Sequence, residues 1–458
     1  NLEGLNADIN LQNSELSISA ERAKIKETEL LDITAVMLET EVGEADSLNI
    51  KATLQAGKSE QSYWLKDSPI STHTEQIIEQ IEIDGVLDVG LDLDIPLSGG
   101  KDIDYQVKSS FKSVDVRHIA TDLSFKGVEG VLQVSSLTGV TAKDLTAQFL
   151  GQKANVNITT RTDAEQEKSK TELKNTTMEE SNAALNSHTV ISVDSEIPVG
   201  SLLNYFEQKE IIGLSGVLNY HAMLKVPNQG EAYPKLTVSS DLKGVSYDSP
   251  VPFKKESTEA RNLSLDLLIN PDKMNLNVSL RSEDSLDIDS NLLFIGNEFS
   301  SGEVLIGGAA SKKMDANGVN VVANVDNIEL QPWVEFIQKN ITELESSESN
   351  ILQRIDLDIG ALNAYGQNFE RTQAVILKPK GAWQVDIKGK SIQGKINFPS
   401  EKAVLDIQLD HIFLENESPD KYSNGEGQVA STSDTGMLDP RELPEITFST
   451  KKLVKDKV

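Results

Sequence analysis

Long runs of alternating apolar and polar residues dominate this chain. From Gly85 to Leu97 every second residue is aliphatic, and the residues between are mainly Asp, Gly and Pro. Since side chains alternate across a β-strand, this segment predicts a strand with one apolar face and one acidic, solvated face. Its 13 residues would span about 40 Å, far more than an ordinary strand. What lies against the apolar face therefore decides the function.

The same alternation returns along the chain, interrupted by turn residues. Asn270–Asp272, Gly296–Asn297 and Asn317–Gly318 have the composition of tight turns. Short strands joined by such turns predict an antiparallel meander. The further runs that predict strands are Leu48–Leu54, Ala154–Ile158, Leu263–Ile269, Met274–Leu280, Val319–Val325 and Leu405–Leu409.

Three short helices are predicted between the strands. The first begins with a capping-box sequence, Thr72–Glu75; the second follows Pro198, and Pro332 suits the first position of the third. Each carries an apolar stripe that a helix normally buries in the core. The stripes are Ile77, Ile78 and Ile81; Leu202, Leu203 and Phe206; and Trp333, Phe336, Ile337 and Leu344.

An internal repeat is visible at a constant offset. The segment from Gly85 to Pro96 matches the segment from Gly216 to Pro227, and a striped helix precedes each copy. Such self-similarity indicates stacked units that share one extended core. We expect one continuous repetitive sheet over residues 1–458, with repeats at 69–160 and 197–310, further strands over 311–458, and disordered insertions at 161–186 and 416–436.

Composition removes several function classes. The chain carries 72 acidic and 43 basic residues, a formal net charge of −29, whereas nucleic-acid binding requires a basic surface. We therefore expect no nucleic-acid partner. Without cysteine there is no thiolate metal site and no cysteine nucleophile. No stretch approaches the roughly 18 apolar residues of a membrane helix, and the start at Asn1 leads us to expect a fragment or processed piece.

No motif indicates catalysis. The five histidines lack metal-ligand spacing, no GxSxG segment occurs, and Gly57-Lys58-Ser59 lacks the first glycine of a phosphate-binding loop. The acidic pairs Asp92/Asp94 and Asp356/Asp358 lack the ligand order of a calcium loop, and strand alternation places both pairs on the solvated face. We expect no enzyme activity, no cofactor, no metal and no catalytic residue.

The apolar faces need a cover. Each fully buried Val, Leu or Ile contributes roughly 1.5–3 kcal/mol, and three short helices cannot shield so many strands. Either a second sheet packs on the first, or the sheet curls into a trough that holds an apolar ligand. Slim aliphatic side chains, with only 5% aromatic residues, favour a trough for fatty acyl chains, which gain about 0.8 kcal/mol per buried methylene. The expected lining residues are Leu87, Val89, Leu91, Leu93, Ile95, Leu97, Leu218, Leu224, Val226, Leu405, Ile407 and Leu409.

Three stretches carry a family resemblance. The helix followed by Gly85–Leu97, the stretch Trp383–Pro399 and the stretch Leu438–Pro444 together resemble the large YhdP-type members of the AsmA-like superfamily. The resemblance covers the chain from about residue 69 onward. It implies a protein anchored in the bacterial inner membrane by one N-terminal helix, which crosses the periplasm as a curved β-sheet and carries phospholipid toward the outer membrane. We expect that anchor to lie outside this chain.

The combined prediction is a mainly β protein: an elongated, curved antiparallel sheet with a taco-like groove and a few short amphipathic helices. Its predicted function is a lipid-transport bridge, with phospholipid acyl chains lying along the hydrophobic groove between the inner and outer membranes. The alternative is a structural or adhesive β-sandwich or solenoid with a dry core. An enzyme on a β-solenoid ranks a distant third, because no tryptophan lies in an acidic cluster.

Overall fold

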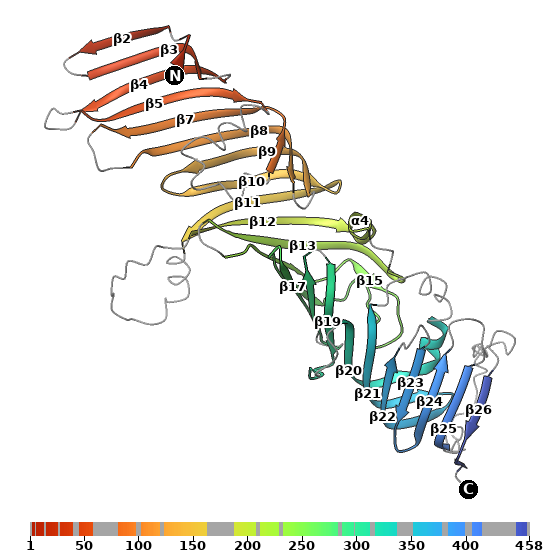
Figure 1. Ribbon diagram of the computed structural model, residues 1–458. Helices are drawn as coiled ribbons and strands as arrows, with labels where there is room; N and C mark the ends of the chain where they lie inside the picture. Colours follow the sequence, from red (N-terminus) through yellow and green to blue (C-terminus); the bar gives the residue numbers. More distant parts are fainter. Residues whose placement is uncertain are drawn as a thin grey trace, which may run out of the picture. The chain divides into compact units, whose positions relative to one another are not determined.

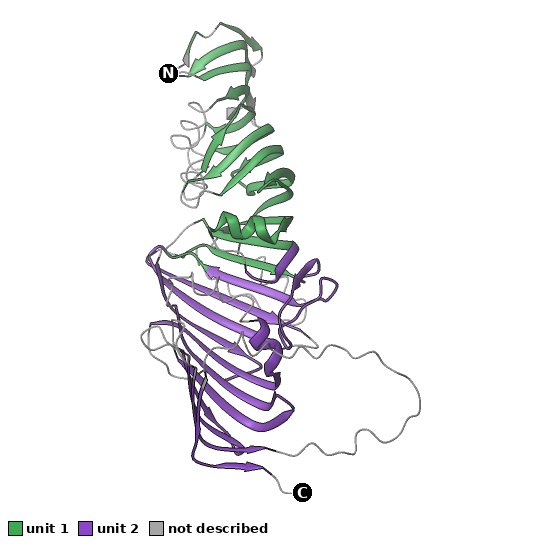
Figure 2. Cartoon of the chain, turned by 90° about the vertical axis from the view of Figure 1, so that its right-hand side faces the viewer, with its two compact units in different colours: residues 1–209, 217–240, 268–270 green, residues 210–216, 241–267, 271–458 purple. Residues whose placement is uncertain are grey.

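The structure, a computed structural model, is mainly β and divides into two compact units (Figures 1 and 2). Unit 1 comprises residues 1–209, 217–240 and 268–270, and unit 2 comprises residues 210–216, 241–267 and 271–458. The structure describes the whole chain except residues 1, 5, 13–14, 26–27, 40–44, 58–80, 98–101, 120–122, 163–186, 208–210, 229–231, 283–285, 297, 312–316, 337–350, 378–382, 399–404, 415–445 and 456–458.

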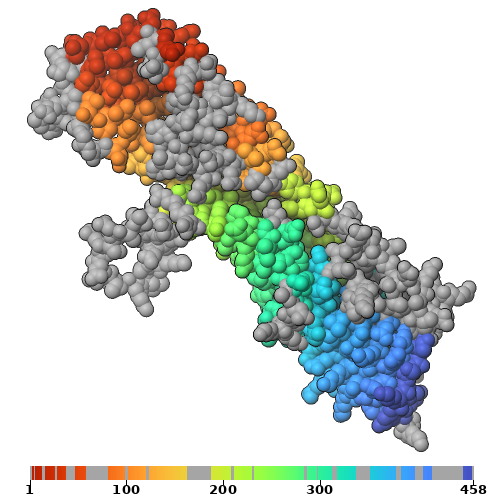
Figure 3. Space-filling model, in the orientation of Figure 1, coloured from red at the N-terminus to blue at the C-terminus, as the bar shows by residue number. Residues whose placement is uncertain are grey.

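Unit 1 is an antiparallel sheet in which most strands pair with their neighbours in sequence, as the predicted meander requires. Each colour band therefore borders the next along the surface in Figure 3. A helix, α4 (Val199–Tyr205), follows the twelfth strand. The strands are β1 (Leu2–Glu3), β2 (Ala7–Gln12), β3 (Glu15–Ile25), β4 (Thr28–Glu39), β5 (Ala45–Ala56), β6 (Ile81–Asp84), β7 (Leu87–Pro96), β8 (Asp104–His118), β9 (Ser124–Ser135), β10 (Gly139–Phe149), β11 (Gln152–Thr162), β12 (Ser187–Pro198), most of β13 (Leu214–Pro227), and β14 (Lys235–Ser240).

Unit 2 is a mixed sheet. Most pairs are antiparallel, as expected, but β19 pairs parallel with β20, β20 with β21, and β25 with both β26 and β27. Parallel neighbours require a crossover connection, and the helix at 330–336 lies in the one between β20 and β21. The strands are β15 (Val245–Tyr247), β16 (Asn262–Leu268), β17 (Lys273–Arg281), β18 (Ile288–Ile295), β19 (Glu298–Ile306), β20 (Gly318–Glu329), β21 (Leu352–Ala364), β22 (Gln367–Leu377), β23 (Trp383–Lys388), β24 (Ile392–Phe398), β25 (Leu405–Leu414), β26 (Ile446–Thr450) and β27 (Leu453–Lys455).

Both units contain β-bulges. In unit 1 the register of β8 shifts on either side of Val114, beside Ser113 at φ 59°, and that of β10 shifts around Asp144 at φ 55°. In unit 2 the pairing of β18 with β19 shifts between Leu293 and Phe294, and that of β24 with β25 shifts between Gln393 and Gly394. Bulges leave residues unpaired and bend the strand.

The helix predictions are partly wrong. The predicted stripe residue Ile81 lies in β6, and the rest of the first predicted helix falls outside the described residues. The second helix ends at Tyr205, so Phe206 follows it and is 59% exposed rather than packed into the core. The third helix begins at residue 330, two positions before Pro332.

Two parts of the sheet share one register. Gly216 pairs with Val245, and His221 pairs with Ser239. Subtracting 131 from each number gives Gly85 beside Val114, and the pair Gly90 and Lys108, which are partners in β7 and β8. A Cβ on Gly85 would lie 3.1 Å from the Val114 side chain, and one on Gly216 would lie 3.0 Å from the Val245 Cα. The repeat boundaries at 69–160 and 197–310 stay predictions. The predicted insertion at 161–186 begins too early, because Arg161 and Thr162 belong to β11; residues 163–186 and 416–436 lie outside the described part.

Candidate functional site

An apolar face runs across the strands of unit 1. One row of cross-strand partners begins in β5 and ends in β10, and a second row begins in β9 and ends in β14. Because directly opposed residues lie on the same face of a sheet, each row is a continuous band of aliphatic side chains. The first row is Ala52, Leu91, Val107, Val134 and Val140, and the second is Leu132, Ala142, Ile158, Ile191, Leu224 and Leu236.

Burial varies along this face. Next to the bulges the side chains form a dry cluster that includes Leu87, Phe111, Val114 and Val128, all buried. Leu91, by contrast, is only half-buried, as are five of the six members of the second row. A second sheet packed on this face would bury these side chains fully. A second buried cluster includes Val107, Val134 and Val140 of the first row, and Ala52 of that row is buried as well. The half-buried side chains of the apolar face are therefore Leu91 and most of the second row.

The opposite face of β7 is acidic, and Asp88 and Asp92 on it have partners, whereas Asp94 Oδ1 is buried without one among the described residues. Asp88 accepts hydrogen bonds from Lys112 Nζ at 2.6 Å and from Gln55 Nε2 at 3.1 Å, and these hold the pKa of its carboxyl below the usual value. Asp92 accepts from Asn49 Nδ2 at 3.0 Å and lies 3.2 Å from Lys51 Nζ. Their ion-pair partners are exposed lysines, so these carboxylates belong to a solvated surface.

Unit 2 repeats the arrangement. A row of cross-strand partners crosses seven strands from β19 to β25, and every member is half-buried. Parallel and antiparallel pairs both contribute, so the band does not depend on strand direction. The row is Val304, Val321, Ile355, Ile376, Val385, Ile396 and Ile407.

Most of the predicted lining residues lie on these two faces. Leu87, Val89, Leu91, Leu93 and Ile95 all point to the apolar face of β7, where Leu93 opposes Ile50 and Tyr105. The β13 residues of the prediction oppose apolar or Thr partners in β12: Leu218 faces Ile197, Leu224 faces Ile191, and Val226 faces Thr189. Ile407 and Leu409 lie in β25 of unit 2.

Two predicted residues are placed differently. Leu97 follows the last residue of β7 and is 49% exposed, because the strand ends at Pro96. Leu405 begins β25, but its side chain lies outside the described residues.

The solvated position expected for Asp356 is wrong. Its carboxyl is buried, 5% exposed, and it accepts two hydrogen bonds from Arg354, at 2.6 Å from Nε and 2.9 Å from Nη2. Asp358 does face outward and accepts from Gln373. Buried acids normally need such a bidentate partner, so Asp356 is a structural ion pair.

Sequence reasoning missed an aromatic cluster on the apolar side of unit 2. Phe253 packs against Ile306, Ala323 and Val325, and its ring meets the Trp333 ring edge-to-face at 5.9 Å. Trp333 in turn contacts Phe336 at 6.1 Å. Phe253 lies in an irregular loop without periodic pattern, so only the three-dimensional packing reveals it.

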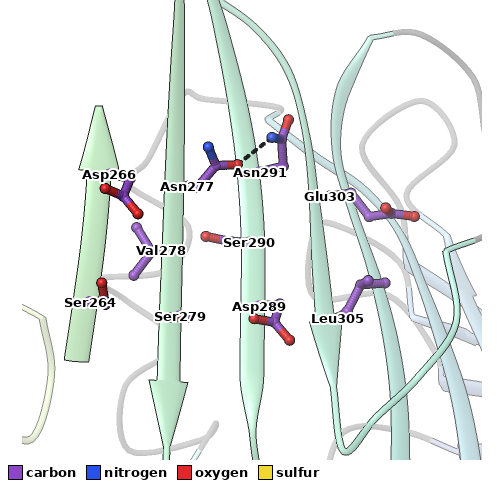
Figure 4. Close-up of a pocket in the computed structure, with 10 residues that line it drawn as sticks. All are labelled: Ser264, Asp266, Asn277, Val278, Ser279, Asp289, Ser290, Asn291, Glu303 and Leu305. Carbon is purple, nitrogen blue, oxygen red and sulfur yellow. Dashed lines mark hydrogen bonds between the residues drawn. The ribbon is translucent and has the colours of Figure 1, made fainter. Parts of the chain in front are cut away.

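One pocket of about 210 Å³ opens on the polar side of β16 to β19 (Figure 4). Asp266, Asp289 and Glu303 contribute carboxylates to it, and Asn291 donates a hydrogen bond to Asn277. Sites for small molecules are generally larger and mainly apolar, so this pocket does not suit an acyl chain. Within the described ranges, no three His, Asp or Glu side chains gather closely enough to hold a metal ion.

Comparison with known proteins gives the family. The family model described as YhdP protein matches residues 1–457. Neither the curated proteins nor the solved structures contain a match to this chain. Among the helices that the structure describes, none is long and apolar enough to cross a membrane. Since the family model covers nearly the whole chain, the chain belongs to the YhdP family.

Proposed function

We propose that this chain is a lipid conduit, in which phospholipid acyl chains lie on the apolar faces of the two sheets and move between the bacterial inner and outer membranes. The observation that carries the proposal is the largely half-buried second row of unit 1 together with the half-buried row of unit 2. Such surface is costly in water, whereas an acyl chain on it gains about 0.8 kcal/mol per buried methylene.

The chemistry of the faces supports the same proposal. An acyl chain needs no directional partners, and the rows offer methyl groups rather than hydrogen-bond donors. The acidic outer face, with its lysine partners, keeps the other side of unit 1 in water. The phospholipid headgroup would remain at the solvated margin of the face. The proposal includes a periplasmic location at the bacterial inner membrane and no enzymatic activity.

The rival function, a structural protein with a dry core, has less support. In a β-sandwich the inward-facing side chains interdigitate and are fully buried. Each unit has buried clusters on its apolar face, but Leu91, Leu224 and Ile376 on the same faces are only half-buried.

A charge-insertion experiment tests the conduit. Leu91→Glu with Leu93→Glu places two carboxylates on the apolar face of β7, and we expect lipid co-purifying with the protein to fall by at least tenfold, because a charge facing an acyl chain is poorly solvated. Mass spectrometry of extracted lipid gives the readout.

The matched control adds the same charge to the outer face. Gln133→Glu and Gln148→Glu lie opposite Lys108 and Lys126 respectively, so this variant should fold and retain its lipid. Equal lipid in the apolar-face variant, provided it folds, would contradict the proposal.

A further inference from the structure

The indole N–H of Trp333 is a buried donor without an acceptor. Its Nε1 is sealed from solvent, and no described group accepts its hydrogen bond. Leaving such a donor unsatisfied is unfavourable, and buried tryptophans usually find a partner. The donor therefore points to an acceptor supplied by a bound molecule.

The surroundings define the polarity of that molecule. Trp333 lies between the rings of Phe253 and Phe336, and Phe253 rests on the buried aliphatic cluster of β19 and β20. A molecule reaching the indole must therefore be largely apolar. The acceptor has to be an oxygen that such a molecule carries at low desolvation cost.

Two cations of the segment that carries Phe253 are already engaged. We call residues 241–261 the strap. Lys255 Nζ donates to four strap carbonyls, those of Leu242, Val245, Glu256 and Glu259, at 2.7–3.1 Å. Arg261 donates to Glu259 Oε1 at 2.8 Å and to the carbonyls of Phe253 and Lys254. Neither side chain is free to neutralise a phosphate, so the geometry favours a neutral oxygen.

We infer that Trp333 donates its indole N–H to an acyl ester carbonyl of a bound phospholipid, with the acyl chain packed along Phe253 and Phe336. This inference rests on the proposed function and deepens it. It gives unit 2 a binding position for the ester group, which lies between the acyl chain and the headgroup of the lipid. Trp333 is thus a specificity residue for ester-linked lipids.

The test compares diacyl with diether phosphatidylethanolamine, since the diether lipid lacks the carbonyl oxygens. We expect the wild-type chain to bind the diacyl lipid about fivefold more tightly, the effect of one neutral hydrogen bond. Trp333→Phe keeps the aromatic packing and removes the donor, so it should bind both lipids with the weaker affinity. Trp383→Phe, a tryptophan replacement in β23 of the same unit, should keep the preference.

A second measurement places the lipid at the indole. In a Trp64→Phe, Trp383→Phe background only Trp333 fluoresces, because the chain has three tryptophans. Bromine near the ester end of the acyl chain should quench it more than bromine at the methyl end. Three results would each overturn the inference while leaving the conduit intact. These are equal affinity of the wild type for both lipids, a preference for the diacyl lipid retained by Trp333→Phe, and stronger quenching by bromine at the methyl end. Absence of binding by either lipid would overturn the conduit as well.

Discussion

Gly216 occupies a position that other residues cannot share. Its φ is 111°, and a Cβ there would lie 2.0 Å from the Gly244 carbonyl oxygen. The close approach allows the first residues of β13 to pair with β15. Gly90, in β7, has open space instead, because nothing lies within 4 Å of the position that its Cβ would take.

Replacing these two glycines should have different effects. Gly216→Ala combines an unfavourable φ with a backbone clash, so we expect it to lower the free energy of unfolding by about 3 kcal/mol or more. Gly90→Ala should change it by no more than about 0.5 kcal/mol. Thermal and denaturant unfolding measure both. Similar stability for the two variants would show that the β13–β15 approach is not required.

At the scale of elements, the strap depends on one buried cation. Lys255 is only 5% exposed, and burial lowers the pKa of its ammonium while the Glu259 carboxylate acts in the opposite direction. Its ammonium group joins four carbonyl oxygens from different parts of the strap. The side chain therefore holds the strap, and with it Phe253, over the sheet of unit 2.

Neighbouring lysines allow a matched test of this role. Lys255→Met removes the donors while keeping similar bulk, so amide exchange across residues 241–261 should accelerate by tenfold or more. Lys254→Met removes only an exposed pair with Glu256, which is worth little, and should leave exchange unchanged. Hydrogen exchange measured by mass spectrometry reports both; equal protection in the two variants would contradict the assignment.

The strands were largely predictable from sequence, but their partners were less so. Alternation is a local property, so it located β5, β7, β17 and β20 closely. The parallel pairs of β20 depend on strands on either side of it and on a crossover, which no local pattern encodes.

The candidate site was predictable to a similar extent. The period-2 pattern identified Leu91 and Leu224 as members of apolar faces, because one buried face fixes the side on which they lie. Their neighbours across the sheet, such as Val107 and Ile158, follow only from the register. The burial of Asp356 depends on Arg354 adopting a particular conformation, and the alternation of a strand contains no signal for it.

At the scale of the whole molecule, both units carry a row of half-buried aliphatic side chains, each on its own sheet. A conduit uses such surfaces one after another, whereas a lipid store uses them independently. The net charge of −29 disfavours adhesion to anionic membrane surfaces. The conduit proposal therefore predicts how substitutions on the apolar faces of the two units, alone and together, affect lipid transfer.

Single substitutions that place a charge on one apolar face distinguish a conduit from a lipid store. Leu91→Glu in unit 1 and Ile376→Glu in unit 2 should each leave lipid bound to the other unit, and so reduce bound lipid only partly. Each should nevertheless abolish lipid movement between the membranes as fully as the double variant, since either lesion interrupts the route. Lipid transfer in cells that depend on the protein, together with bound lipid per chain, gives the comparison. Partial, additive losses of transfer would indicate storage.

The shared register of β7 with β8 and of β13 with β14 has a consequence for how such chains change length. A gene segment encoding 131 residues, the spacing between Gly85 and Gly216, can be duplicated or lost with its strand ends still meeting compatible partners. Recombination at this spacing lengthens or shortens the protein in whole steps. Under the proposed conduit function, the distance that such a protein bridges would be set by the number of copies rather than by new sequence.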